Sequence, residues 1–212
     1  PLEYEVKGRD RQLLNGILLG ITGLMAIFLT AVFAANHKAI FPSAALLTWC
    51  VLACLCVDFG FFHKLFQLQP ENNAIYRAAT ESAMAASFVV FLHTFLRIGA
   101  WHGFIRMLAG VWMVAQLVLV AVAIIDPRLA ATFARLSFVA IGVIGGLLIM
   151  FLALRGQDRA LALVPTWLLL LVWIFAAAVM LTGRLAGDVA VSGLVAGLVL
   201  LVVLIGFTVT QF

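Results

Sequence analysis

The chain is a succession of long apolar runs separated by short polar segments. An α-helix rises about 1.5 Å per residue, so about 20 residues are needed to cross a hydrocarbon core of about 30 Å. A window of about 19 residues predicts seven runs of that length, at 13–35, 40–62, 74–98, 104–125, 129–154, 160–182 and 189–212. Each is about twice as long as a transmembrane barrel strand. The sequence therefore predicts an all-α, polytopic integral membrane protein with seven transmembrane helices.

Composition and loop length support one compact membrane domain. Hydrophobic residues make up 66% of the chain and charged residues 10%, against about 45–50% and about 25% in soluble domains. A soluble globular fold is therefore excluded. The polar segments are short, so consecutive helices should be neighbours in an antiparallel bundle. The net charge of +4 is spread over several such segments, which argues against nucleic-acid binding.

The two ends of the sequence predict its domain organisation. Residues 1–10 (PLEYEVKGRD) have the alternation of a short strand and lack the basic start and apolar centre of a signal peptide. We expect them to be the end of a truncated extracytoplasmic segment that precedes a transmembrane domain at 11–212. The last apolar run has no polar stop sequence after it, so we expect its helix to continue in a longer protein.

Four charged residues within the predicted helices are candidates for a ligand-binding or switch site: Asp58, Arg77, Glu81 and Arg135. A charged side chain at the bilayer centre costs about 2.5–3.5 kcal/mol on insertion scales, so such residues are functional candidates unless they pair or reach the headgroups. Asp58 lies near the end of the second run, while Arg77 and Glu81 share one face of the third. Arg135 lies near the start of the fifth run. The antiparallel topology places all four near one membrane surface, where we expect a polar pocket.

Two interpretations of these four residues are open. They could form an interhelical ion-pair network that fixes helix packing, with both arginines extending to the headgroups. They could instead bind a small polar or anionic ligand, or act as a switch through protonation of Glu81. In either case Asp126 and Arg128 are expected at the rim of the pocket.

Glycines four residues apart predict close approach of helix backbones. The pairs fall on the first, fifth and seventh predicted helices, at Gly16 and Gly20, Gly142 and Gly146, and Gly193 and Gly197. We expect these helix-packing residues to face other helices of the same bundle, with a dimer face as the alternative.

The remaining residue types argue against several familiar chemistries. The three lysines, Lys7, Lys38 and Lys64, lie outside the cores of the predicted helices, so none could form a retinal Schiff base on the seventh helix. His63 and His93 lie toward opposite surfaces, and no metal or haem site is expected. The sequence has no phosphate-binding glycine loop, nucleophile elbow or His-Glu-x-x-His motif. We therefore predict no cofactor and no enzymatic activity in this segment.

Four short segments give the chain a resemblance to a known family. They are LNGILLG at 14–20, DFG at 58–60, YRAATE at 76–81 and FLHTFLR at 91–97. In these segments the chain resembles the bacterial seven-transmembrane receptors with diverse intracellular signalling modules. Glu81 and Arg97 are the positions that match the third helix of that family.

The resemblance implies an extracytoplasmic domain, a seven-helix core and a cytoplasmic output domain. That output would be a diguanylate cyclase, a cyclic-dinucleotide phosphodiesterase, a histidine kinase or a phosphatase. The chain would then be a sensor and signal-transduction module of the bacterial inner membrane. It would work as a homodimer and relay an extracytoplasmic or intramembrane signal through its seventh helix.

The orientation in the membrane and the class of function each have an alternative. The resemblance implies an N-terminus outside and a cytoplasmic C-terminus, yet eight Lys and Arg residues lie toward the implied outer surface and five toward the inner one. The positive-inside rule favours the reverse. A small transporter or channel subunit is the alternative function, although such proteins usually place polar residues through the bilayer centre.

Overall fold

The computed structural model describes the chain apart from residues 1, 37, 63–71, 98–102, 182–187 and 212. Within the described residues, seven helices are long and apolar enough to cross a membrane, and no strand is formed. They are α1 (Leu2–Asn36), α2 (Ile40–Asp58), α4 (Asn73–Phe95), α5 (Gly103–Ile125), α6 (Pro127–Leu154), α7 (Asp158–Leu181) and α8 (Asp188–Thr210). The predicted all-α fold with seven membrane-spanning helices is confirmed.

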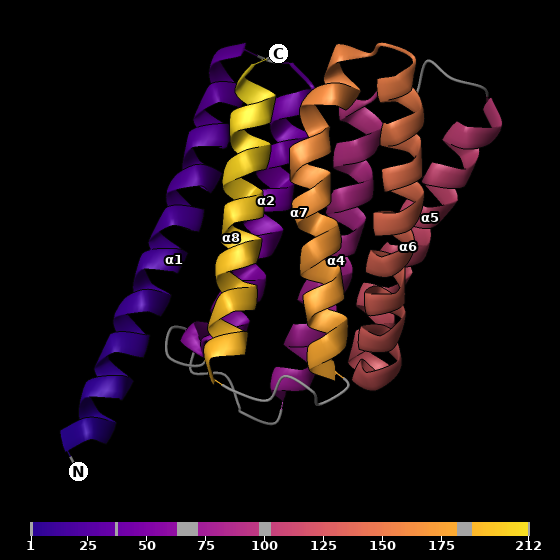
Figure 1. The fold of residues 1–212 in the computed structure, drawn as a ribbon. Coiled ribbons are helices and arrows are strands. Elements are labelled where there is room, and N and C mark those ends of the chain that lie inside the picture. Colours follow the sequence, from indigo (N-terminus) through magenta and orange to yellow (C-terminus); the bar gives the residue numbers. More distant parts are fainter. Residues whose placement is uncertain (1, 37, 63–71, 98–102, 182–187, 212) are drawn as a thin grey trace.

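The helices run up and down in one bundle, each antiparallel to the one before it (Figure 1). Helices α1, α2, α4, α6, α7 and α8 form a closed ring in which each contacts the next and α8 returns to α1. Helix α5 lies outside this ring, against α4 and α6, and α2 also contacts α8. The start of α1 and the end of α8 therefore lie at opposite ends of the bundle (Figure 1).

Helix α4 provides much of the core because it packs against α2, α5 and α6. Its residues Phe88, Phe91 and Phe95 are almost fully buried. The Phe88 ring meets the ring of Phe138 on α6 edge-on, with 5.9 Å between the ring centroids. The buried Ser87 hydroxyl donates a hydrogen bond to the Met84 carbonyl one turn earlier. The core therefore includes small polar residues whose hydrogen bonds stay within their own helix.

The second helix is shorter than the sequence predicted. It ends at Asp58 rather than at 62, with Phe59 as its C-cap. Gly60 follows with φ +71°, and its N–H donates to the Val57 carbonyl at 3.1 Å. A left-handed residue after the C-cap is the usual way to end a helix, and glycine adopts it without steric cost. This turn places Asp58 at the very end of α2.

The prediction that residues 1–10 form a strand is wrong, since α1 is already helical at Leu2. The segment has no strand to pair with among the described residues. Its acids and bases also recur every four residues, as in Glu3 and Lys7 or Glu5 and Arg9. That spacing stabilises a helix.

Glycines of α6 and one glycine of α8 pack against tryptophan side chains of α7. A Cβ on Gly146 would lie 3.0 Å from Nε1 of Trp167, and that Nε1 donates to the Gly142 carbonyl at 2.8 Å. A Cβ on Gly197 would lie 3.1 Å from Cδ1 of Trp173. Small residues at these positions allow α7 to pack closely against both neighbours.

The other predicted packing glycines have no such neighbour. A Cβ on Gly16, Gly20 or Gly193 would meet no atom of the described residues within 4 Å. The close approach within the bundle that we expected there is not found. The four-residue spacing makes a close approach possible, but it carries no information on whether another helix lies opposite.

Candidate functional site

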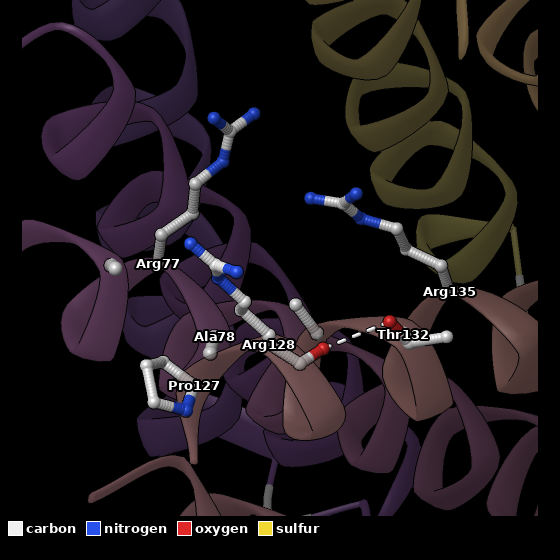
Figure 2. A pocket seen from close by; sticks show the side chains of 8 residues that line it. Arg77, Ala78, Pro127, Arg128, Thr132 and Arg135 are labelled. Atoms are coloured by element: carbon white, nitrogen blue, oxygen red, sulfur yellow. Dashed lines mark hydrogen bonds between the residues drawn. The ribbon is translucent and has the colours of Figure 1, made fainter. Parts of the chain in front are cut away.

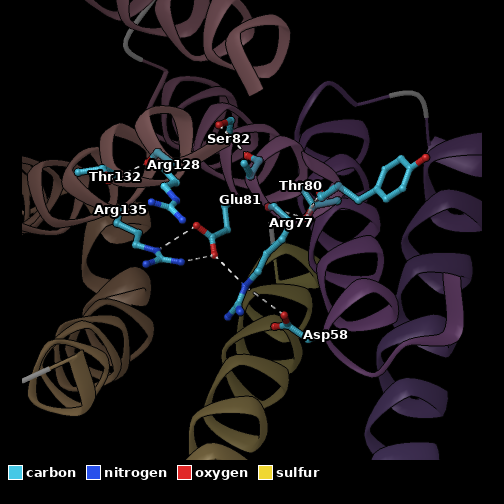
Figure 3. A network of polar contacts seen from close by, with 10 residues as sticks. Asp58, Arg77, Thr80, Glu81, Ser82, Arg128, Thr132 and Arg135 are labelled. Carbon is cyan, nitrogen blue, oxygen red and sulfur yellow. Dashed lines mark hydrogen bonds and ion pairs between the residues drawn. The ribbon is translucent and has the colours of Figure 1, made fainter. Parts of the chain in front are cut away.

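The four charged residues predicted from the sequence come together at one end of the bundle. Asp58 is the last residue of α2, Arg77 and Glu81 lie in the first turns of α4, and Arg135 lies near the start of α6. Figure 3 shows Glu81 between the two arginines and Asp58 beside Arg77. We call these four residues the charge quartet. The structure brings them together because α2 runs toward this end while α4 and α6 start from it.

Glu81 is the centre of the quartet. Its Oε2 accepts a hydrogen bond from Nε of Arg135 and its Oε1 accepts one from Nη2, both at 3.1 Å. The Nε of Arg77 lies 3.3 Å from Oε1 of Glu81 and 3.3 Å from Oδ1 of Asp58. A two-bond contact between arginine and a carboxylate is stronger and more directional than a single bond. The Glu81–Arg135 pair therefore joins α4 to α6, and the Arg77–Asp58 pair joins α4 to α2.

Burial differs within the quartet. The Glu81 side chain is 11% exposed and that of Arg135 is 44% exposed, while those of Arg77 and Asp58 are 53% and 31% exposed. The two arginines match the two carboxylates in charge. A buried carboxylate whose ionic partners were removed would be strongly destabilising, so Glu81 is the member of the quartet that most needs its partners, Arg77 and Arg135.

Next to the quartet lies a pocket of about 290 Å³ between α4 and α6. Arg77, Arg128 and Arg135 line it, together with Thr132 and small apolar residues (Figure 2). Arg128 therefore lies at the pocket, as predicted. Asp126 is not among the lining residues and is instead the N-cap of α6, where its Oδ1 accepts from the backbone N–H groups of Arg128 and Leu129 at 3.0 and 3.1 Å.

A second polar contact was missed from the sequence. Nε2 of Gln116 on α5 donates to Oγ of Ser137 on α6 at 2.6 Å, and both residues are buried. Oε1 of Gln116 and Nε1 of nearby Trp112 are buried and have no hydrogen-bond partner among the described residues. A single glutamine in an apolar run has no sequence pattern from which a partner could be predicted. The rotation of α5 about its axis determines which residue of a neighbouring helix the glutamine contacts.

The other predicted positions lie apart from the quartet. His93 and Arg97 are at the opposite end of α4, and Arg97 is exposed with φ +52° just after the helix. His37, His63, His102 and Lys64 lie outside the described residues. Within the part of the chain that is described, no group of three His, Cys, Asp or Glu residues is arranged to hold a metal ion.

The fold defines a multi-pass membrane protein, a seven-helix bundle with a network of ion pairs at one end. Residues 11–211 match the family model described as 7TM diverse intracellular signalling, and the chain belongs to that family. It is therefore a transmembrane sensor module in signalling. Such a module is not itself a catalytic domain, in agreement with the expectation for this segment. Comparisons with curated proteins and with solved structures found no match.

Proposed function

We propose that this module converts an extracytoplasmic or intramembrane signal into a movement of α8, and that the charge quartet is its switch. The observation that carries the proposal is the position of Glu81, which is 11% exposed and pairs with both Arg77 and Arg135. Any change that weakens one of these pairs frees a charge near the ends of three helices. A signal acts by favouring one of two arrangements of such an element.

Helix packing supports a route from the quartet to α8. Asp58 is at one end of α2, and α2 contacts both α4 and α8. A displacement of α2 relative to α4 at the Asp58–Arg77 ion pair would therefore also displace the surface on which α8 packs. The proposed relay then passes into an output domain beyond α8, of the cyclic-dinucleotide or histidine-kinase type, in a homodimer.

The test is Glu81→Gln in the parent receptor, with basal output measured in cells. The amide keeps the size of the side chain but removes its charge, so the balance between the two arrangements should shift. Coupling energies of switches correspond to about 5-fold or more in activity, and we expect a change of that size. Asp158→Asn, at the opposite end of the bundle and outside the quartet, is the matched control. Equal output from wild type and Glu81→Gln would show that the quartet is structural.

We propose a bacterial inner-membrane location, with the N-terminus outside and the C-terminus cytoplasmic. Membership of the 7TM diverse intracellular signalling family supports this orientation. The count of Lys and Arg, eight toward the implied outer surface and five toward the inner one, favours the reverse. A domain before α1 that is translocated by its own signal would set the orientation independently of this count.

The alternative of a small transporter or channel subunit makes a different prediction. Polar residues would then have to line a path through the bilayer, whereas the quartet lies at one end of the bundle. Solute flux into proteoliposomes that is abolished by Glu81→Ala would support transport. Absence of flux together with a changed output would support the relay.

A further inference from the structure

The pocket beside the charge quartet has an unusual charge balance. Three guanidinium groups line it, those of Arg77, Arg128 and Arg135, and no acidic side chain is among its described lining residues. Figure 2 shows the three side chains extending toward the same space from α4 and α6. The two carboxylates of the quartet contact the arginines but do not line the pocket.

Among the described residues, much of the hydrogen-bonding capacity of these arginines is unused. A guanidinium has five N–H donors. Arg77 uses Nε toward both carboxylates, and Arg135 uses Nε and Nη2 toward Glu81. The Arg128 side chain has no ion-pair partner among the described residues, since only its backbone N–H and carbonyl are bonded, to Asp126 and Thr132.

We propose that this pocket binds a phosphate group. The guanidinium fork matches the oxygens of phosphate and carboxylate, and three arginines from two sides suit the several oxygens of a tetrahedral phosphate better than a carboxylate. The volume of about 290 Å³ is at the lower limit for small-molecule sites. The methyl groups of Ala74, Ala78 and Ala131 line the rest of the pocket and would contact a short apolar part of the ligand.

The proposal rests on the proposed function and names the ligand class for the same site. A bound phosphate would compete with Glu81 and Asp58 for Arg77 and Arg135. It would thereby weaken the ion pairs that join α2 to α4 and α6, which is the change that the relay requires. The phosphate could come from a free solute or from the headgroup of a phospholipid, because the pocket lies at the membrane surface.

The test uses the purified chain in dodecyl maltoside micelles, which carry no phosphate. Inorganic phosphate is titrated against sodium chloride of equal ionic strength, and the midpoint of thermal unfolding is measured. We expect phosphate to raise the midpoint. Arg128→Gln removes a charge-assisted contact without breaking an ion pair, so the apparent affinity should fall about 10-fold. Arg128→Lys should retain part of the affinity, and Arg106→Gln, at the opposite end, should retain all of it.

A second titration separates the two sources of phosphate. Phosphatidylglycerol or diacylglycerol is added to the micelles. An Arg128-dependent rise with phosphatidylglycerol, and none with free phosphate, would identify a lipid headgroup as the ligand. A midpoint that neither probe raises, or that rises equally in Arg128→Gln, would overturn the proposal.

The two proposals can fail separately. Phosphate binding together with unchanged receptor output in Glu81→Gln would leave the site standing and contradict the relay. Altered output in Glu81→Gln without phosphate binding would support the relay and contradict the phosphate site.

Discussion

Helices α4 and α5 lie side by side and have the same length of 23 residues, yet they occupy opposite environments. In an 18-residue stretch of each, 61% of the residues are buried in α4 and 11% in α5. Helix α4 carries Arg77, Glu81 and two serines, whereas α5 is almost entirely apolar in its membrane-spanning part. The more polar helix is therefore the buried one.

This difference in burial between α4 and α5 is explained by the lipid that surrounds the helices. Lipid tails are as apolar as leucine, so the burial of apolar side chains contributes little to helix association. Charged and hydroxyl groups, in contrast, must avoid the lipid and find partners inside the protein. Leu117 and Val118 of α5 are 62% and 55% exposed and face lipid without cost. In α5 the buried polar residue is Gln116, which points to α6.

The largest effect is expected from Glu81→Leu, which removes the charge that makes α4 a core helix. Arg77 and Arg135 would lose their shared partner in the membrane. Breaking a buried pair costs about 3–5 kcal/mol. Both arginines are half-exposed and can extend to the headgroups, so we expect a loss of about 3 kcal/mol in the free energy of unfolding.

The measurement is reversible unfolding in mixed detergent micelles. The double variant Glu81→Leu with Arg135→Met should recover part of the loss, because it leaves one unpaired arginine fewer. A loss below about 0.5 kcal/mol, the usual range of surface substitutions, would show that the ion pairs do not stabilise α4.

Matched leucines on the two helices test packing alone. Leu92 of α4 is 7% exposed and Leu117 of α5 is 62% exposed. Leu92→Ala leaves a cavity inside the bundle, which costs about 2 kcal/mol from the missing contacts. Leu117→Ala should change the free energy of unfolding by less than about 0.5 kcal/mol, because lipid fills the space. Equal effects in the same unfolding assay would mean that α5 is as tightly packed as α4.

Glycine substitutions extend the comparison to α6. A Cβ on Gly145 would overlap the ring of Trp167, which is 4% exposed and held by its hydrogen bond to the Gly142 carbonyl. The ring cannot move aside without breaking this bond, so Gly145→Ala should lower the free energy of unfolding by about 1.5 kcal/mol.

Gly110 of α5 is the control for this substitution. A Cβ there meets no described atom within 4 Å, so Gly110→Ala should be neutral or slightly stabilising because alanine is the better helix former. A stabilising Gly145→Ala would show that α7 can move away from α6.

Features of this fold that depend on depth in the membrane could be predicted from the sequence. The length of a span is set by bilayer thickness. Because consecutive spans alternate in direction, the end of α2 and the starts of α4 and α6 lie at the same membrane surface. That is why Asp58 and Glu81 were expected in one cluster. The turn at Gly60, which ends α2 early, depends on local backbone geometry.

Features that depend on which neighbour a helix face meets could not be predicted in this way. The open space beside Gly16 and the hydrogen bond of Gln116 both depend on the rotation of one helix against another. Hydrophobic periodicity gives little information on that rotation here, because the membrane-spanning parts of α1 and α5 are apolar around most of the helix.

The smallest effects are expected at Gln116 and Ser137, where the informative result is which of two substitutions lowers the free energy of unfolding more. Gln116→Leu removes a hydrogen bond between α5 and α6 but also removes the buried Oε1 that has no partner. The remaining Ser137 hydroxyl can donate to a backbone carbonyl of the preceding turn. Hydrogen bonds between membrane helices contribute about 0.6 kcal/mol on average, so the loss in free energy of unfolding should be about 0.5 kcal/mol. Ser137→Ala instead leaves Nε2 of Gln116 unpaired as well, and the loss should be larger, about 1 kcal/mol. If Ser137→Ala proved milder than Gln116→Leu in the same assay, Gln116 would have another partner, and α5 would have a second polar contact with the bundle.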